Sequence, residues 1–255
     1  MGQPQQGDAR AEPEEADRGG QDPPRSREAA RALRVFALHA DVVVCVSGIW
    51  QTTCTVVHSG DETFVIDSPV LPEELEALPS VLQQAGWALT GLLATHGDWD
   101  HVLARTIWAD APLGVAESTA QRMAAEPGEA QRKLRSYDTE NYIERPPLPL
   151  GDVQQLPVPG KLDIGELELE LHPATGHTAD GMAIVVPWAG VLVCGDYLSP
   201  VEDPTGHTTD AAAYRDTLER LRPLVQAAEW VVPGHGAPIK PGRAEEILDD
   251  HLAKL

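Results

Sequence analysis

The chain has 255 residues, 42% of them hydrophobic, and a formal net charge of −21. This length suits one large domain with a sizeable core, and no run approaches the 18 consecutive apolar residues of a membrane span. The negative charge disfavours nucleic acids and anionic membranes as partners. We therefore expect a small-molecule substrate, and the sequence leaves the oligomeric state open.

The N-terminal segment differs in composition from the rest of the chain. Residues 1–28 contain no Val, Ile, Leu or aromatic residue, which predicts a disordered tail ahead of a single domain over 29–255. This tail lacks an apolar export signal. Cys45, Cys54 and Cys194 each lie in an apolar run and form no C-x-x-C pair, which is typical of reduced, buried thiols. Together these features favour a cytoplasmic protein.

The first half of the predicted domain alternates between strands and helices. Short β-branched runs at 33–38, 41–48, 52–59 and 62–68 predict an antiparallel meander. A helix is expected over 72–86, since Pro72 and two acids begin it and Gly86 ends it. A strand at 88–95 and helical patterns at 101–109 and 117–135 follow. Residues 136–151 have the composition of a loop, which we place over a site.

The second half repeats this organisation. Strands are expected at 152–158, 166–172, 181–188, 190–196 and 229–234, with helices at 210–222 and 243–254. Each half therefore has a sheet that helices cover. Burying the two sheets against each other gives an α/β fold, a four-layer αββα sandwich.

Metal-capable side chains gather where predicted strands end. The stretch "HGDWDH", residues 96–101, contains two histidines and two aspartates directly after an apolar run. Other strands lead to Asp67, His177, Asp196 and His235. Residues that follow strands of one sheet edge converge in space, and a metal site needs such rigid support. Imidazole and carboxylate suit zinc and related divalent ions. The remaining histidines, such as His207, are expected to be structural or exposed.

In order and spacing, about residues 33–240 resemble the metallo-β-lactamase-fold hydrolases. The resemblance rests on "HGDWDH", on His177 in "GHT", on Asp196 in "GD" and on His235 in "PGHG". It implies a binuclear site for two divalent ions, with zinc foremost and iron or manganese as alternatives. In that site His96 and His177 would hold the first metal, Asp100, His101 and His235 the second, and Asp196 would bridge both. Asp67 would support the site loop without binding metal.

Asp98 departs from the family pattern, which usually has histidine at this point. Two interpretations stay open: a carboxylate ligand on the first metal, or a side chain that misses the metal and bonds to a neighbouring ligand. The flavodiiron branch of the fold has a carboxylate here, which makes iron or manganese more plausible than usual. Trp99 is either a core aromatic or a wall of the substrate pocket, and Tyr137 and Tyr142 of the predicted loop are further wall candidates.

The predicted activity is hydrolysis of a small ester, lactone or thioester carbonyl by a metal-bound hydroxide, with Asp100 and Asp196 as the catalytic carboxylates. No serine or cysteine in the sequence has the setting of an activated nucleophile, so water must attack. The alternative is a diiron redox or oxygen-handling protein, or a non-catalytic ligand-binding protein, on the same fold.

Overall fold

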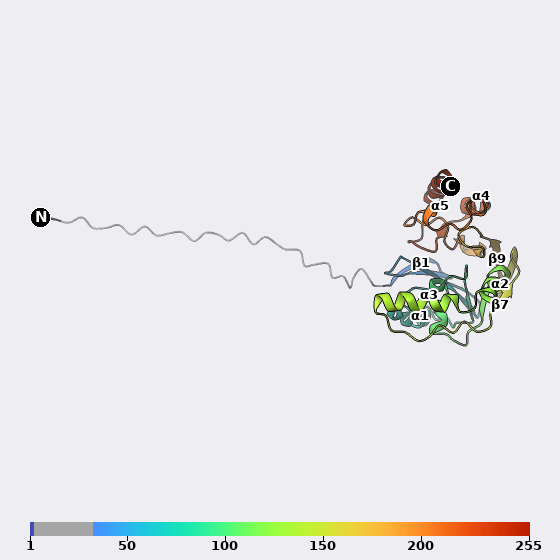
Figure 1. Ribbon diagram of the computed structural model, residues 1–255, viewed down its shortest axis with the longest axis horizontal. Coiled ribbons are helices and arrows are strands. Elements are labelled where there is room, and N and C mark those ends of the chain that lie inside the picture. Colours follow the sequence, from blue (N-terminus) through green and yellow to red (C-terminus); the bar gives the residue numbers. More distant parts are fainter. Residues whose placement is uncertain (3–32) are drawn as a thin grey trace.

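The computed structural model describes residues 1–2 and 33–255 (Figure 1). Apart from Met1 and Gly2, the predicted tail over 1–28 lies outside the described residues. No helix in the described part of the chain is long and apolar enough to cross a membrane.

The larger sheet has seven strands in the order β1 to β7, which is also their order in the chain. They are β1 (Arg34–His39), β2 (Val42–Val46), β3 (Thr53–Ser59), β4 (Glu62–Asp67), β5 (Gly91–Leu93), β6 (Leu113–Ala116) and β7 (Gln154–Leu156). The first four pair antiparallel, which confirms the predicted meander. From β4 onward the pairing is parallel, because helices or loops connect consecutive strands.

The smaller sheet has five strands in the order β12-β11-β10-β9-β8. They are β8 (Gly160–Ile164), β9 (Leu167–Pro173), β10 (Met182–Val186), β11 (Val191–Val193) and β12 (Trp230–Val232). Only β11 and β12 are parallel among these pairs. Their connection contains helix α4 (Ala211–Ala227), so both strands end at the same edge of the sheet.

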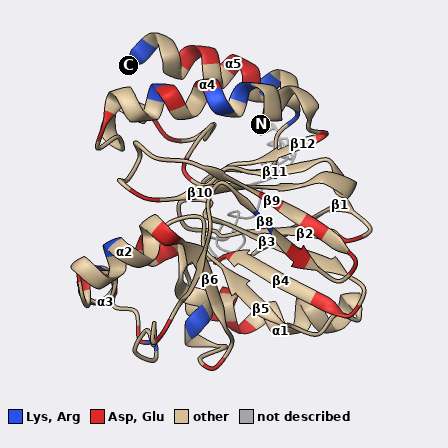
Figure 2. Cartoon of the chain, turned by 90° about the vertical axis from the view of Figure 1, so that its right-hand side faces the viewer, with Lys and Arg blue, Asp and Glu red and all other residues tan. Residues whose placement is uncertain are grey.

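Helices cover the outer face of each sheet (Figures 1 and 2). The α-helices are α1 (Pro72–Ala85), α2 (Glu117–Ala125), α3 (Glu129–Asn141), α4 (Ala211–Ala227) and α5 (Pro241–Lys254). Short 3-10 helices are η2 (Trp99–His101), η3 (Leu103–Thr106), η4 (Pro187–Ala189) and η5 (Pro204–Gly206). In Figure 2, α4 and α5 lie over the smaller sheet, and α1 lies beyond the larger sheet on the opposite side. This arrangement confirms the αββα sandwich.

The alternation of side chains along each strand separates the hydrophobic layers. In β2, Val44 and Val46 belong to the cluster between the two sheets, whereas Cys45 belongs to the cluster beneath α1. In the smaller sheet Ile184 faces the same central cluster, and Ala183 faces the cluster under α4 and α5. Because side chains alternate with period two, each sheet contributes to two cores.

Several local predictions were wrong. The helix expected over 101–109 is instead the pair of 3-10 turns η2 and η3, and the helix expected over 117–135 is two helices. The two helices are separated at "PG", where Gly128 has φ +75° and is the N-cap of α3. Helix α3 continues to Asn141, so the predicted loop over 136–151 begins only at Tyr142. Strands β6 and β8 were not predicted.

Candidate metal centre

Strand ends from both sheets carry the candidate ligands. Asp67 ends β4, and His96 follows β5 of the same sheet. His177, Asp196 and His235 follow β9, β11 and β12 of the other sheet. The centre therefore lies at one end of the sandwich, where rigid strands position the loops that hold the ligands.

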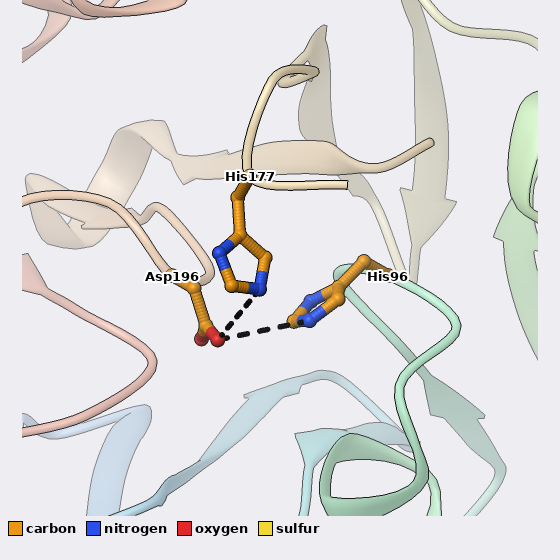
Figure 3. Close-up of side chains that lie close together, drawn as sticks. All are labelled: His96, His177 and Asp196. Carbon is orange, nitrogen blue, oxygen red and sulfur yellow. Dashed lines mark ion pairs between the residues drawn. The ribbon is translucent and has the colours of Figure 1, made fainter. Parts of the chain in front are cut away.

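The first ligand group consists of His96, His177 and Asp196 (Figure 3). Asp196 Oδ2 lies 3.2 Å from His177 Nε2 and 3.8 Å from His96 Nε2. These atoms point toward one another from three separate loops. Their spacing leaves room for one ion among two nitrogens and one oxygen, which is a donor set that suits zinc.

The second ligand group consists of Asp100, His101 and His235. Asp100 Oδ2 lies 3.7 Å from His235 Nε2 and 3.8 Å from His101 Nε2. Asp196 also reaches this group, since its Oδ1 lies 3.2 Å from His101 Nε2 and its Oδ2 lies 3.4 Å from His235 Nε2. Asp196 is thus the one residue within 4 Å of both histidine pairs among the predicted ligands.

Hydrogen-bond partners behind the histidines set which ring nitrogen faces the centre. Asp67 Oδ2 lies 3.1 Å from His101 Nδ1, and Asp67 also accepts hydrogen bonds from the amide and the hydroxyl of Thr95. His235 Nδ1 lies 3.1 Å from the carbonyl oxygen of Trp50. His235 Nδ1 is thus hydrogen-bonded on the outward side, and His101 Nδ1 faces the Asp67 carboxylate at ion-pair distance, so in both histidines Nε2 is directed to the centre.

Buried polar atoms at the centre lack partners within the described chain. His96 Nε2, His101 Nε2 and Asp196 Oδ1 are fully buried and make no hydrogen bond. Such atoms cost free energy unless something satisfies them. All three lie on the inward side of the ligand groups, and nitrogen and carboxylate oxygen are the donors that divalent transition metals take. The residues present therefore fit two metal ions.

The charges at the centre are strongly coupled. Burial alone would raise the pKa of Asp196, but the surrounding imidazoles, His101 foremost, outweigh it and hold that pKa well below its usual range. Burial lowers the pKa of His96, and the neighbouring His101 lowers it further. At His101, His177 and His235 the nearby carboxylates outweigh burial and raise the pKa of the imidazole. A divalent ion would bind these histidines in place of their protons.

Asp98 has one oxygen at the centre and one bound elsewhere. Its Oδ2 lies 3.8 Å from His96 Nε2 and 3.9 Å from His177 Nε2, whereas its Oδ1 accepts a 2.6 Å hydrogen bond from Arg122. Burial alone would raise the pKa of Asp98. The nearby imidazoles and the Arg122 guanidinium outweigh that effect and hold this pKa well below its usual range. Asp98 thus bonds to Arg122, which is not one of the predicted ligands, and also faces the first ligand group, so its role as a metal ligand stays a prediction.

A cavity of about 610 Å³ opens over the centre. Trp50 and Trp99 line it, and both rings contact Tyr137 of α3, with centroid separations of 4.9 Å. Trp99 thus packs against Trp50 and Tyr137 and also lines the cavity. Tyr142 was wrongly placed there, because its side chain is 95% exposed at the C-terminal end of α3.

Sequence reasoning missed several residues of this region. Trp50, Glu202 and Asp203 line the cavity, and so does His207, which was expected to be structural or exposed. Arg122 and Asp180 form ion pairs next to the first ligand group. Asp180 could have been noticed as the acid that ends "GHTAD", since it follows a predicted ligand by three residues. The others carry no local signal.

The fold and the site together define a metal-binding αββα protein whose ligands come from the ends of both sheets. Residues 47–235 match the metallo-beta-lactamase superfamily, and the chain belongs to this family of metallohydrolases.

Solved structures agree with this assignment at the level of the fold. A metallo-beta-lactamase from Pontibacter korlensis is 20% identical, with a TM-score of 0.65 over 88% of this chain and 100% of that one. The metallo-beta-lactamase DIM-1 is 19% identical, with a TM-score of 0.63 over 88% of this chain and 98% of its own. VMB-1 is 16% identical, with the same TM-score and coverage.

Proposed function

We propose that this protein is a binuclear metallohydrolase that cleaves a small ester, lactone or thioester. The observation that carries the proposal is the position of Asp196 between two ligand groups, with buried donor atoms that make no hydrogen bond in the described chain. Zinc is the metal that best suits a set of imidazole and carboxylate donors in close approach.

The bound ions would supply the nucleophile by lowering the pKa of a coordinated water to about 7, and would polarise the carbonyl oxygen. The chain's own contribution is to hold the ligands without rearrangement. Asp67 and Trp50 fix the histidine rings from behind, and Asp100 and Asp196 supply negative charge that balances the cations. Metal ions held in place by these ligands would stabilise a developing oxyanion.

Two nucleophilic side chains lie beside the centre, and neither is activated. The Ser199 hydroxyl donates to the carbonyl oxygen of His235 and is not paired with a base. Burial raises the pKa of the Cys194 thiol, and the nearby Asp196 raises it further, so the thiol stays protonated. Water is therefore the attacking group we propose.

The walls of the cavity support a substrate without a carboxylate. None of the described residues that line it is a lysine or arginine, and Glu202 adds a carboxylate next to the aromatic wall. Burial raises the pKa of Glu202, because the nearby imidazole of His235 does not fully offset the loss of solvation of the carboxylate. Trp50 is 48% exposed and offers an apolar surface to an acyl or alkoxy group. A neutral carbonyl compound fits this lining better than a β-lactam or a glutathione thioester, both of which carry carboxylates.

A redox or oxygen-handling diiron protein is the second candidate. It is favoured by Asp98, because a third carboxylate near the ions makes the donor set harder and suits iron or manganese. A ligand-binding protein without activity would use the same cavity.

Metal analysis joined to a hydrolysis screen tests these proposals. The as-isolated protein is analysed for zinc, iron and manganese, and is then assayed on neutral ester, lactone and thioester reporters beside β-lactam and phosphodiester reporters. We expect two zinc ions per chain, cleavage of a neutral carbonyl reporter, loss with chelator and recovery with added metal. Iron with no cleavage of any reporter would refute the hydrolase and favour the second candidate.

A further inference from the structure

Arg122 on α2 forms a bridge between two carboxylates beside the first ligand group. Its Nη2 donates to Asp98 Oδ1 at 2.6 Å and its Nη1 donates to Asp180 Oδ1 at 2.7 Å. Asp180 is 1% exposed in its side chain, and its second oxygen accepts from the Gly97 amide at 3.0 Å. The Arg122 side chain is 18% exposed. We call Arg122, Asp98 and Asp180 the arginine bridge.

The arginine bridge connects the two loops that carry the histidines of the first group. Gly97 and Asp98 directly follow His96, and Asp180 lies three residues after His177. Each loop thus presents a carboxylate to the same guanidinium, and the two guanidinium nitrogens are held in one plane. The second group, Asp100, His101 and His235, is ordered instead through Asp67 and Trp50. Asp67 also accepts hydrogen bonds from Thr95, which directly precedes His96, so the arginine bridge adds a support at the first position to one that both positions share.

The two oxygens of Asp98 have different partners in the arginine bridge and at the first ligand group. Because Oδ1 is bound by Arg122, only Oδ2 is directed toward His96 Nε2 and His177 Nε2, at 3.8 and 3.9 Å. A free carboxylate could rotate and chelate an ion with both oxygens, or turn away toward solvent, since Asp98 is 26% exposed. The hydrogen bond opposes both movements, because charge-assisted bonds from arginine are short and directional.

We propose that Arg122 is a positioning residue that makes Asp98 a one-oxygen ligand of the first metal. This inference rests on the metal centre of the proposed function. It explains how an aspartate can bind metal at a position where the family usually has histidine. The charge of Arg122 is not what matters most, because a cation near a metal ion weakens its binding. The planar fork is needed, since it holds Asp98 and Asp180 at the same time.

The test is Arg122→Lys, which keeps the positive charge and removes the fork. Zinc affinities at both positions are measured on the full-length protein by competition with a chromophoric chelator, and cobalt(II) absorption reports the coordination. Removal of such a supporting partner typically costs about 10- to 100-fold in metal affinity. We expect that loss at the first position and a changed cobalt(II) spectrum, with the second position within about twofold of the wild type.

A double-mutant cycle separates the proposed positioning from a structural effect of the Asp180 side of the bridge. In the Asp98→Ala background, Arg122→Lys should cause little further loss at the first position, because the ligand that it positions is gone. Arg132→Lys is the matched control, since Arg132 forms an exposed ion pair with Glu129 one helix away. It should change neither affinity nor spectrum.

Two results would overturn the inference. One is an Arg122→Lys protein with wild-type affinity and spectrum at the first position. The other is a loss that persists undiminished in the Asp98→Ala background, which would mean that Arg122 acts only through Asp180. Melting temperatures and the second-position affinity identify any misfolded variant, and Asp180→Asn then provides an independent break of the bridge. Failure of the hydrolysis screen with both metals bound would refute the proposed activity and leave this inference intact.

Discussion

Asp67→Asn tests whether the carboxylate behind His101 sets the metal affinity of the second position. In the structure Asp67 Oδ1 accepts from the Thr95 amide, and Oδ2 lies 2.8 Å from the Thr95 hydroxyl and 3.1 Å from His101 Nδ1. Asparagine is nearly isosteric and its oxygen can keep the amide hydrogen bond. Its NH₂ group then faces His101 Nδ1 and donates where the carboxylate accepted.

That exchange inverts the histidine tautomer. An Nδ1 that accepts a hydrogen bond carries no proton, so the neutral ring must place its proton on Nε2, the atom that faces Asp196 and Asp100. A protonated Nε2 does not bind metal. Outer partners of metal ligands typically contribute 10- to 100-fold to affinity, which corresponds to about 1.4–2.7 kcal/mol. We expect a loss of this size at the second position and a smaller one at the first.

Stepwise zinc competition against a chromophoric chelator gives both affinities in one titration. Asp163→Asn is the matched control, because Asp163 is exposed on β8 and is far in the sequence from each predicted ligand. Two zinc ions bound by Asp67→Asn with wild-type affinity would refute the reasoning, since the tautomer of His101 would then not depend on Asp67.

Three further predictions concern other buried carboxylates. Asp196→Ala should lose both metals and the activity together, and a variant that retains two metals by elemental analysis would contradict the shared ligand. Glu74 is 2% exposed and accepts from the Ser47 hydroxyl and two backbone amides, so Glu74→Ala should cost about 3 kcal/mol in urea unfolding, whereas the exposed Glu73→Ala should cost little. Burial would raise the pKa of Asp180, but Arg122 outweighs it and lowers that pKa, so its stabilisation is complete above pH about 4 and is lost as pH falls through the lower folded value. Asp180→Asn should therefore flatten the acid limb of the unfolding free energy of the chelator-treated protein, and an unchanged limb would contradict this.

The positions of the ligands could be predicted because each one follows a strand with a strong apolar pattern. Asp196 comes after "VLVC" and His235 after "WVVPG", and residues of both strands belong to the hydrophobic clusters. Period-two alternation and β-branched residues identify such strands, and the αββα layers followed from the same patterns. The sequence placed the ligands at one sheet edge, whereas the structure brings together strand ends from both sheets.

The supports of the site could not be predicted, because they depend on tertiary contacts without a local signal. Arg122 is 24 residues from Asp98 and 58 from Asp180 in the chain. Trp50 reaches His235 through its backbone carbonyl, a group that every residue has. In contrast, the break between α2 and α3 does have a signal, since "PG" at 127–128 is typical of a turn. There the helical composition on both sides led to the wrong prediction of a continuous helix.

The glycine before His235 provides a test of how closely the two sheet ends approach at the centre. A Cβ added at Gly234 would overlap Asp196 Oδ1 and lie 2.9 Å from the carbonyl carbon of Gly195. Both atoms belong to Asp196 or to the residue before it, so the added methyl group of Gly234→Ala must displace Asp196 from both ligand groups. We expect a destabilisation of about 1–3 kcal/mol and a parallel loss of affinity at both metal positions.

Gly242→Ala is the matched control for that substitution. Gly242 lies in the first turn of α5 and an added Cβ there meets no atom within 4 Å, so alanine should leave metal binding unchanged and the melting temperature equal or slightly raised. Chelator competition and thermal unfolding of both variants measure these effects. If only one metal position weakened in Gly234→Ala, Asp196 would serve that position alone, and the binuclear arrangement would need another bridging group.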